Sequence, residues 1–223
     1  MPPCPAPHSS ASNTCWLYLV RHAETDNNRA RPRRLQGRRT DPGLSDEGRR
    51  QAEAVGRFLA GLPIDAVYVS PLLRARQTAE AIALPHRLSV EVVDDLREVD
   101  VGVWDGLDWD EVQRTDPEAY RRFMADASVH PYLGGENLTT VQKRVVPALE
   151  KLMARNVGRT VVAVAHNIVN RCCLAHLLHL PLAEFRTIPQ ENCGINVLRY
   201  REGRVKLVSI NIAVHLYPDS LHA

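Results

Sequence analysis

Short apolar runs alternate along this chain with segments of helical periodicity, and this alternation constrains the fold more than any other feature. The runs 16–20 (WLYLV), 64–70 (IDAVYVS) and 160–166 (TVVAVAH) predict buried strands. The last of these is the most apolar and the richest in β-branched residues, which predicts a central position in a sheet. The run 89–95 (SVEVVDD) is more polar and predicts a strand at the edge.

Helical signals follow the first apolar run. Ser45 is placed to cap a helix, and Asp46 and Glu47 would stabilise its positive N-terminal end. Apolar residues that would supply the buried face of this helix then recur at helical spacing, at Ala52, Val55, Leu59 and Leu62.

Three more helices and a hairpin complete the pattern. Helices are expected after Pro71, over about 140–155 and over 168–180. The runs 195–200 and 204–212 predict an antiparallel hairpin. Strand–helix alternation with an antiparallel end predicts an α/β fold, a three-layer sandwich whose mostly parallel central sheet is flanked by helices.

The chain is expected to form one domain over residues 16–217. Residues 1–15 hold four prolines in the first seven positions and no basic-then-apolar pattern, which predicts a disordered extension rather than a signal peptide. Residues 218–223 are expected to be a flexible C-terminus. The stretch 105–133 mixes seven acidic residues with three arginines and scattered aromatic residues. It predicts a small helical lid over one rim of the sheet.

Composition excludes several classes of protein. The chain is 44% hydrophobic and 24% charged, so disorder is excluded for its bulk. A net charge of +2 does not indicate a nucleic-acid partner. No apolar run reaches the ~18 residues of a membrane span. The five cysteines have no paired spacing of the zinc or redox type, which favours a reduced, cytoplasmic protein.

Cationic side chains stand where three of the expected strands end. Arg21 and His22 follow the first strand, Arg74 lies in the first turn after the second, and His166 ends the most apolar one. Ligands bind at this edge of such sheets. Guanidinium groups match phosphate oxygens, and a neutral histidine beside them can act as a nucleophile. Any one of the four alone would be explained as a solvated charge, but their convergence favours a phosphate site.

Six ordered segments resemble the histidine phosphatase superfamily, which has the phosphoglycerate-mutase-like fold. The resemblance covers about residues 16 to 200. Ala23 stands where glycine is more usual, and Asn167 replaces a frequent glycine after the second histidine. The matching segments are LVRHAETDNN (19–28), LQGRRTDPGLSDEGRRQA (35–52), SPLLRARQTAEAI (70–82), LREVDVGVWDGL (96–107), GGEN (134–137) and VVAVAHN (161–167).

The resemblance implies a role for each matching residue. His22 would accept the phosphoryl group, and Glu98 would donate a proton to the leaving oxygen; a capping or surface role is the alternative for Glu98. The groups implied to hold the phosphate oxygens are Arg21, Arg74 and His166. Four further residues are expected to contact the substrate: Asn28, Gln36, Gly37 and Asn167. The resemblance implies neither a metal ion nor another cofactor, because the arginines and histidines supply the positive charge.

Three other groups of residues admit both a functional and a structural interpretation. Cys173, His176 and His179 have a spacing that would suit zinc on one helix, but packing of that helix explains them better. Asp108, Asp110 and Glu111 are better explained as the acidic start of a helix than as a cation site. The six arginines between residues 29 and 39 form either a solvated loop or a basic surface that attracts anionic substrates toward the nucleophile.

Three functions remain to be distinguished. The segment 98–107 resembles the phosphatase branches rather than the phosphoglycerate mutases, which predicts a phosphomonoester hydrolase acting through a phosphohistidine on a small phosphorylated metabolite. Arg121 and Arg122 loosely resemble an arginine pair of the mutases, so a cofactor-dependent phosphoglycerate mutase is the alternative. A non-catalytic adaptor that binds a phosphorylated ligand is a remote one, because the catalytic set is complete. A homodimer is left open.

Overall fold

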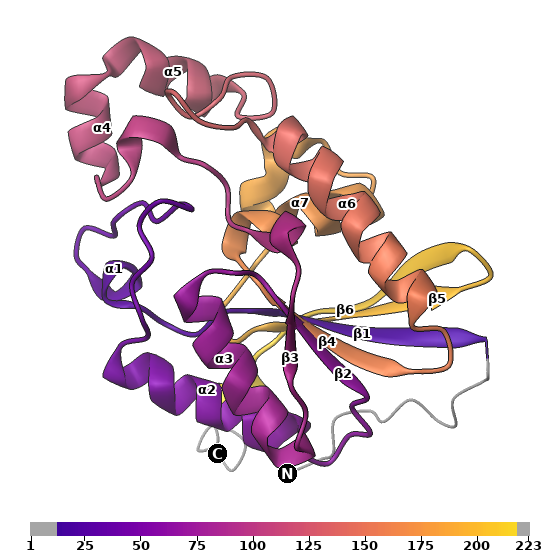
Figure 1. Ribbon diagram of the computed structural model, residues 1–223. Helices are drawn as coiled ribbons and strands as arrows, with labels where there is room; N and C mark the ends of the chain where they lie inside the picture. The colour runs from indigo at the N-terminus through magenta and orange to yellow at the C-terminus, as the bar shows by residue number, and fades with distance from the viewer. Residues whose placement is uncertain (1–12, 218–223) are drawn as a thin grey trace.

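A six-stranded sheet forms the centre of the molecule (Figure 1). The computed structural model describes residues 13–217. The spatial order is β3-β2-β4-β1-β5-β6, in which the first four strands are mutually parallel and the last two form an antiparallel hairpin. The strands are β1 (Thr14–Arg21), β2 (Ala66–Val69), β3 (Val90–Val92), β4 (Thr160–Ala165), β5 (Ile195–Arg201) and β6 (Arg204–Ile212).

Helices cover both faces of this sheet, which confirms the predicted three-layer α/β sandwich. In Figure 1, α2 and α3 lie on one face, and α6 and α7 lie on the other. The α-helices are α1 (Asp26–Arg29), α2 (Asp46–Leu59), α3 (Leu73–Ala83), α4 (Trp109–Thr115), α5 (Pro117–Ala125), α6 (Leu138–Arg155) and α7 (Asn167–Leu177). Short 3₁₀ helices are η1 (Leu84–His86), η2 (Asp94–Leu96), η3 (Gly102–Trp104), η4 (Leu182–Thr187) and η5 (Val214–Leu216). No helix of residues 13–217 is long and apolar enough to cross a bilayer.

The central strands are buried and bring two histidines together. Every residue of β4 is buried, which confirms the central position predicted from its composition. Val20 of β1 pairs with Val164 of β4, and Arg21 pairs with Ala165. Because β1 and β4 are parallel and end in register, the residues that follow, His22 and His166, leave the sheet side by side.

The alternation of side chains along β1 divides the apolar interior into two layers. Leu17 and Leu19 belong to the cluster that includes α6 and α7, whereas Tyr18 and Val20 belong to the cluster with α2 and α3. The helical stripe predicted after Ser45 lies in this second cluster. Ser45 caps α2, since its hydroxyl accepts the Gly48 amide.

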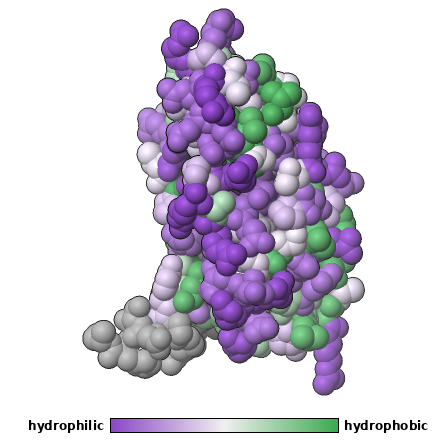
Figure 2. Space-filling view, turned by 90° about the vertical axis from the view of Figure 1, so that its left-hand side faces the viewer, coloured by the Kyte–Doolittle hydropathy of each residue, from purple (hydrophilic) through white to green (hydrophobic). Residues whose placement is uncertain are grey.

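The segment predicted to be a lid, residues 105–133, contains α4, α5 and the loops around them, at the upper left of Figure 1. Trp104 is fully buried and its ring contacts the rings of Trp109, Phe123 and Tyr132 at centroid distances of 6.2, 5.7 and 5.9 Å. Trp104, Phe123 and Tyr132 belong to the same apolar cluster as residues of α6 and α7, and this packing joins the lid to the body. Viewed from the side of α1 and the lid, the surface is largely hydrophilic (Figure 2).

Two predicted boundaries were wrong. β1 begins at Thr14, not Trp16, because Cys15 is fully buried and pairs with Tyr200 of β5. The extension predicted over residues 1–15 therefore includes part of the sheet; residues 1–12 and 218–223 lie outside the described residues. The helix expected over 168–180 ends at Leu177, and His179 lies beyond it in the left-handed region at φ 53°.

Gly48 allows α2 to approach the loop that follows His22. A Cβ at this position would overlap the carbonyl oxygen of Glu24, and that oxygen accepts the Ser45 amide at 3.0 Å. The absence of a side chain at Gly48 thus lets the start of α2 hold the loop after β1.

Gly48→Ala is expected to lower the free energy of unfolding by about 1–3 kcal/mol, the usual cost of overpacking. At an exposed helical position the same exchange would stabilise by about 1 kcal/mol, so the sign of the effect tests the contact. Gly61→Ala is the matched control, since a Cβ there meets nothing within 4 Å. Urea unfolding measures both; a Gly48 variant as stable as the control would contradict the contact.

Candidate active site

His22 lies directly after β1 and is 2% exposed. Its Nδ1 is 2.7 Å from the carbonyl oxygen of Ala23. A carbonyl only accepts hydrogen bonds, so Nδ1 carries the proton and Nε2 keeps its lone pair. Ala23 is itself buried, and its amide donates to Thr78 at 3.0 Å. The side chain that replaces the more usual glycine is thus accommodated without displacing the histidine.

Burial and two arginines hold His22 in the neutral form. Burial lowers the pKa of the His22 imidazole well below its usual 6.5, and the positive charges of Arg74 and Arg21 lower that pKa further. A proton on Nε2 would add a positive charge beside the two that these arginines already carry. The Nε2 lone pair is therefore available to attack an electrophile over a wide pH range.

His166 stands beside His22, with ring centroids 5.1 Å apart. Its Nε2 is 2.7 Å from the Ser70 hydroxyl oxygen, which also accepts the Leu72 amide at 3.4 Å. When the Ser70 hydroxyl donates its hydrogen to Nε2, the ring proton of His166 lies on Nδ1. That nitrogen is buried and has no partner among the described residues, so it is available to a bound ligand.

Two arginines lie beside the histidines, and together with His166 they form a group around His22 that we call the cradle. Arg74 is fully buried, and its terminal nitrogens donate to the carbonyl oxygens of Gly37 at 2.9 Å and Thr40 at 3.1 Å. Arg21 donates to the carbonyl oxygen of Gln190 at 2.6 Å. In residues 13–217 the Nε atoms of both arginines are buried without a partner. Unpaired buried donors are costly, and an anion would satisfy them together.

Glu98 is the acidic side chain at this cradle, and it is 4% exposed. Its carboxyl oxygens accept the amides of Val99 at 2.9 Å and Ile168 at 3.4 Å. Burial raises the pKa of the Glu98 carboxyl, although its two amide donors and Arg74 oppose that shift. A carboxyl with a raised pKa can give up a proton near neutral pH and take it back.

Arg144 of α6 holds the backbone that carries Glu98. It donates to the carbonyl oxygens of Asp95 and Arg97, each at 2.7 Å, and of Glu98 at 3.3 Å. It also pairs with Glu136 at 3.1 Å. Nothing in the sequence singled out Arg144, because its targets are main-chain atoms. Glu136 is occupied by this ion pair and does not line the cavity.

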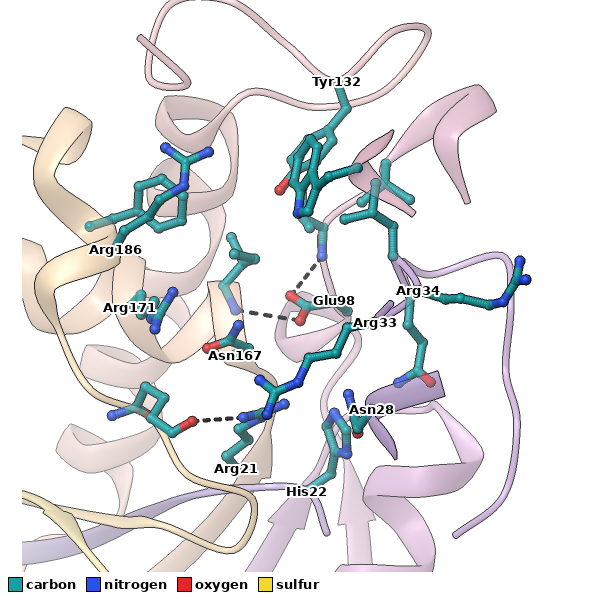
Figure 3. Close-up of a pocket in the computed structure, with 18 residues that line it drawn as sticks. Arg21, His22, Asn28, Arg33, Arg34, Glu98, Tyr132, Asn167, Arg171 and Arg186 are labelled. Atoms are coloured by element: carbon teal, nitrogen blue, oxygen red, sulfur yellow. Dashed lines mark hydrogen bonds between the residues drawn. The ribbon is translucent and has the colours of Figure 1, made fainter. Parts of the chain in front are cut away.

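A cavity of about 340 Å³ opens above His22. Figure 3 shows Glu98 near its centre, Arg171 and Arg186 on one side, and Arg34 on the other, while Arg33 reaches across toward Arg21. Six residues predicted from the sequence line it, namely Arg21, His22, Asn28, Gln36, Glu98 and Asn167. Arg74 and His166 are fully buried beside these residues and are not part of its wall.

Gly37 does not line the cavity, although the sequence predicted it to contact the substrate. Its carbonyl oxygen accepts Arg74 and its amide donates to Asp105 at 3.3 Å. A Cβ here would lie 2.7 Å from a methyl group of Val101 and 2.8 Å from the Val99 carbonyl oxygen. The structure thus assigns Gly37 a supporting place behind Arg74, because its backbone and not a side chain is used.

Sequence reasoning missed the upper part of the cavity. Tyr132 and Phe185 line it, as do Arg171 and Arg186. Arg171 lies four residues after Asn167, so helical spacing could have placed both on one face of α7. Arg186 belongs to η4, whose approach to the site depends on tertiary packing alone.

The arginines of the basic loop, residues 29–39, do not all have the same role. Arg38 and Arg39 pair with the nearly buried Asp100 at 2.8 and 3.1 Å, so these two hold the loop against the segment that follows Glu98. Arg33 and Arg34 line the cavity and are placed to attract an anion. Neither of the two simple predictions for residues 29 to 39 therefore describes the whole loop.

The two groups of residues considered as possible metal sites have structural explanations. Asp108 and Glu111 form a reciprocal cap at the start of α4, as the helix-start interpretation predicted. His179 lies beyond the end of α7, away from the helical spacing that suggested zinc. Within the described residues, no three His, Cys, Asp or Glu side chains are grouped so as to hold a metal ion.

Comparison with known families agrees with this geometry. Residues 17–213 match the model of the histidine phosphatase superfamily (branch 1). The chain belongs to this superfamily, and the resemblance inferred from six sequence segments is confirmed.

Individual relatives cover nearly the whole chain. Phosphoserine phosphatase 1 of Hydrogenobacter thermophilus is 36% identical over 200 residues, which are 90% of this chain and 93% of that protein. Bacillus stearothermophilus YhfR superposes with a TM-score of 0.84 at 28% identity, over 91% of this chain and 99% of that one. A phosphoserine phosphatase from Entamoeba histolytica in complex with phosphoserine gives 0.81 at 28% identity, with the same coverage of both chains.

We propose Glu98 as the proton donor, and leaving groups of different basicity test this. Glu98→Gln is expected to slow the pre-steady-state burst by roughly 10²–10⁴ on an alkyl phosphate, whose alkoxide needs a proton to leave. The loss on p-nitrophenyl phosphate should be far smaller, because nitrophenolate is a weak base. Stopped-flow or rapid-quench bursts are required, since the later hydrolysis step also uses this group.

Arg74→Lys is the control for the Glu98 experiment. It removes the planar donor fork from oxygens that every phosphate ester has, so it should slow both substrates about equally. Equal losses in the Glu98 variant as well would show that another group donates the proton.

Proposed function

We propose that this chain hydrolyses a small phosphorylated metabolite in two steps, through a phosphohistidine on His22. Histidine phosphatases hydrolyse such compounds, and the chain is a phosphatase of that superfamily. One observation carries the assignment of residues. A neutral histidine with a free Nε2 lies among three buried nitrogens that have no partner within the described residues, on Arg21, Arg74 and His166.

In the first step, Nε2 of His22 attacks phosphorus, and the bond from phosphorus to the ester oxygen breaks. The proton of Glu98 goes to the leaving oxygen, which departs as an alcohol. Arg21, Arg74 and His166 hold the three oxygens of the phosphoryl group while it moves between the two atoms. These donors are anchored to the chain before the substrate arrives, so little reorganisation accompanies the transfer.

In the second step, water attacks the phosphohistidine, and the Glu98 carboxylate takes a proton from it. The bond from Nε2 to phosphorus breaks, inorganic phosphate leaves, and both His22 and Glu98 return to their starting protonation states. The same carboxyl thus serves as acid and then as base, which suits its buried position and raised pKa.

We propose phosphoserine as the first substrate to test. The Hydrogenobacter relative is named for it, and the Entamoeba structure holds it. A cavity of about 340 Å³ is of a size for a small metabolite. Within the described residues, Cys15, Cys172, Cys173 and Cys193 are free thiols, which supports the further proposal of a reducing, cytoplasmic location.

The mutase alternative loses the feature that suggested it. Arg121 and Arg122 were compared with a substrate-binding arginine pair, yet neither lines the cavity at His22. Arg122 instead pairs with Glu118 on the surface of α5. The adaptor alternative is disfavoured because the nucleophile, its cradle and the proton donor are all assembled.

His22→Ala is expected to abolish turnover and phosphoryl labelling without unfolding the protein. Wild-type protein quenched in acid during turnover would lose its label, so it is quenched in alkali, where a phosphohistidine is stable, and His22 should carry the phosphate by peptide mapping. His176→Ala, which removes an exposed histidine of α7, is the matched control and should label normally. Robust turnover by the His22 variant would contradict the mechanism.

A further inference from the structure

The wall of the cavity beside α7 carries two arginines that the proposed mechanism does not use. Arg171 projects from α7, and Arg186 projects from η4, which packs against that helix. Both line the cavity, and Figure 3 shows them on the same side of it, with Asn167 and Arg21 on that side as well.

Arg171 is held in place at one edge only. Its Nε donates to the carbonyl oxygen of Ile188 at 2.9 Å, and its guanidinium lies 5.9 Å from the centre of the Phe185 ring. Its two terminal nitrogens have no hydrogen-bond partner in residues 13–217. This half-buried group therefore presents a pair of N–H donors that is already oriented by the protein.

Arg186 is oriented by aromatic rings. Its guanidinium lies 4.7 Å from the centre of the Phe185 ring and 5.5 Å from that of Phe123, and it contacts the sulfur atom of Met124 at 3.4 Å. Stacking of this kind fixes the plane of the guanidinium without neutralising its charge.

Neither of these two charges is neutralised by a direct contact with a carboxylate of the described residues. In the described part of the chain neither arginine forms an ion pair, whereas Arg38, Arg39 and Arg144 on other sides of the site all do. Burial and the charge of Arg186 lower the pKa of Arg171, whereas Glu98 and Tyr132 oppose that shift. Like charges held together repel one another, and an anion bound between them would relieve that repulsion.

The spacing along α7 sets where this anion would lie. His166 caps the start of α7, at the phosphate cradle. Arg171 is four residues beyond Asn167, which corresponds to about 6 Å along the helix. A group bound by Arg171 would thus be separated from the phosphate by a few bonds, as in a two- or three-carbon molecule.

We propose that Arg171 and Arg186 form a second anion subsite, which binds the carboxylate of a short phosphorylated carboxylic acid. This rests on the proposed phosphatase function and specifies its substrate class. The carboxylate matches the two parallel donors of Arg171. The subsite would contribute to binding and orienting the substrate, because no atom of the carboxylate takes part in phosphoryl transfer.

Phosphoserine and phosphoethanolamine provide the test, because they differ only by the carboxylate. The wild type is expected to prefer phosphoserine in kcat/KM. Arg171→Gln and Arg186→Gln should each reduce that preference by roughly 10–10²-fold, the worth of a hydrogen bond between charged groups. Rates on phosphoethanolamine and p-nitrophenyl phosphate should change by less than about threefold. Arg29→Gln, at an exposed arginine that does not line the cavity, is the control for a general loss of charge.

The outcomes separate this proposal from the function on which it rests. Hydrolysis of all three compounds with an unchanged preference in both variants would overturn the subsite and leave the phosphatase assignment intact. A wild type that hydrolyses none of them would overturn both. The inhibition constant of inorganic phosphate measures binding to the cradle formed by Arg21, Arg74 and His166. It should be equal in the wild type and the variants. A loss of that inhibition would mean that the substitutions disturb the cradle, and the carboxylate assignment would fall.

Discussion

The site depends on a desolvated cluster of positive charge that contains an uncharged histidine. Arg21 and Arg74 are tied to backbone carbonyl oxygens, not to carboxylates, apart from a 3.5 Å contact of Arg74 with Asp41. Their charge therefore remains available to a ligand. The same charge, with burial, keeps His22 neutral and so preserves its nucleophilic lone pair. Burial and the adjacent cations therefore have two effects: they keep the nucleophile unprotonated, and they leave the phosphate-binding donors free for the substrate.

The fold positions this cluster through parallel strand pairing and a few close backbone contacts. In-register pairing of β1 with β4 sets His22 beside His166, and Ser70 at the end of β2 orients the second ring. Gly37 and Gly48 allow neighbouring segments to approach closely enough to support Arg74 and the loop after His22. Arg144 then fixes the main chain of Glu98 from the opposite face of the sheet. Each catalytic group is thus supported by an element remote from it in sequence.

The sequence predicted those parts of the site that follow directly from strand ends. Arg21, His22 and His166 were predicted because each adjoins an apolar run, and parallel strands bring such ends to one edge. Gly37 does not line the cavity, and a motif does not distinguish a residue that touches substrate from one whose carbonyl oxygen supports an arginine. Arg186 was not found at all, since the distance from η4 to the site depends on how aromatic rings pack. Thr14 was excluded from the first strand because its neighbour in β5 is distant in sequence.

The ionisation state of His22 in the free protein tests this account most directly. Nitrogen-15 NMR of the imidazole reports both the pKa and the position of the ring proton. The account predicts that His22 is neutral at pH 6.5, with its proton on Nδ1, and that it titrates only at a lower pH. Its pKa should rise when inorganic phosphate occupies the cradle, because the bound anion offsets the arginine charges. A free-protein pKa of 6.5 or higher, or a proton on Nε2, would contradict the claim that burial and the arginines prepare the nucleophile.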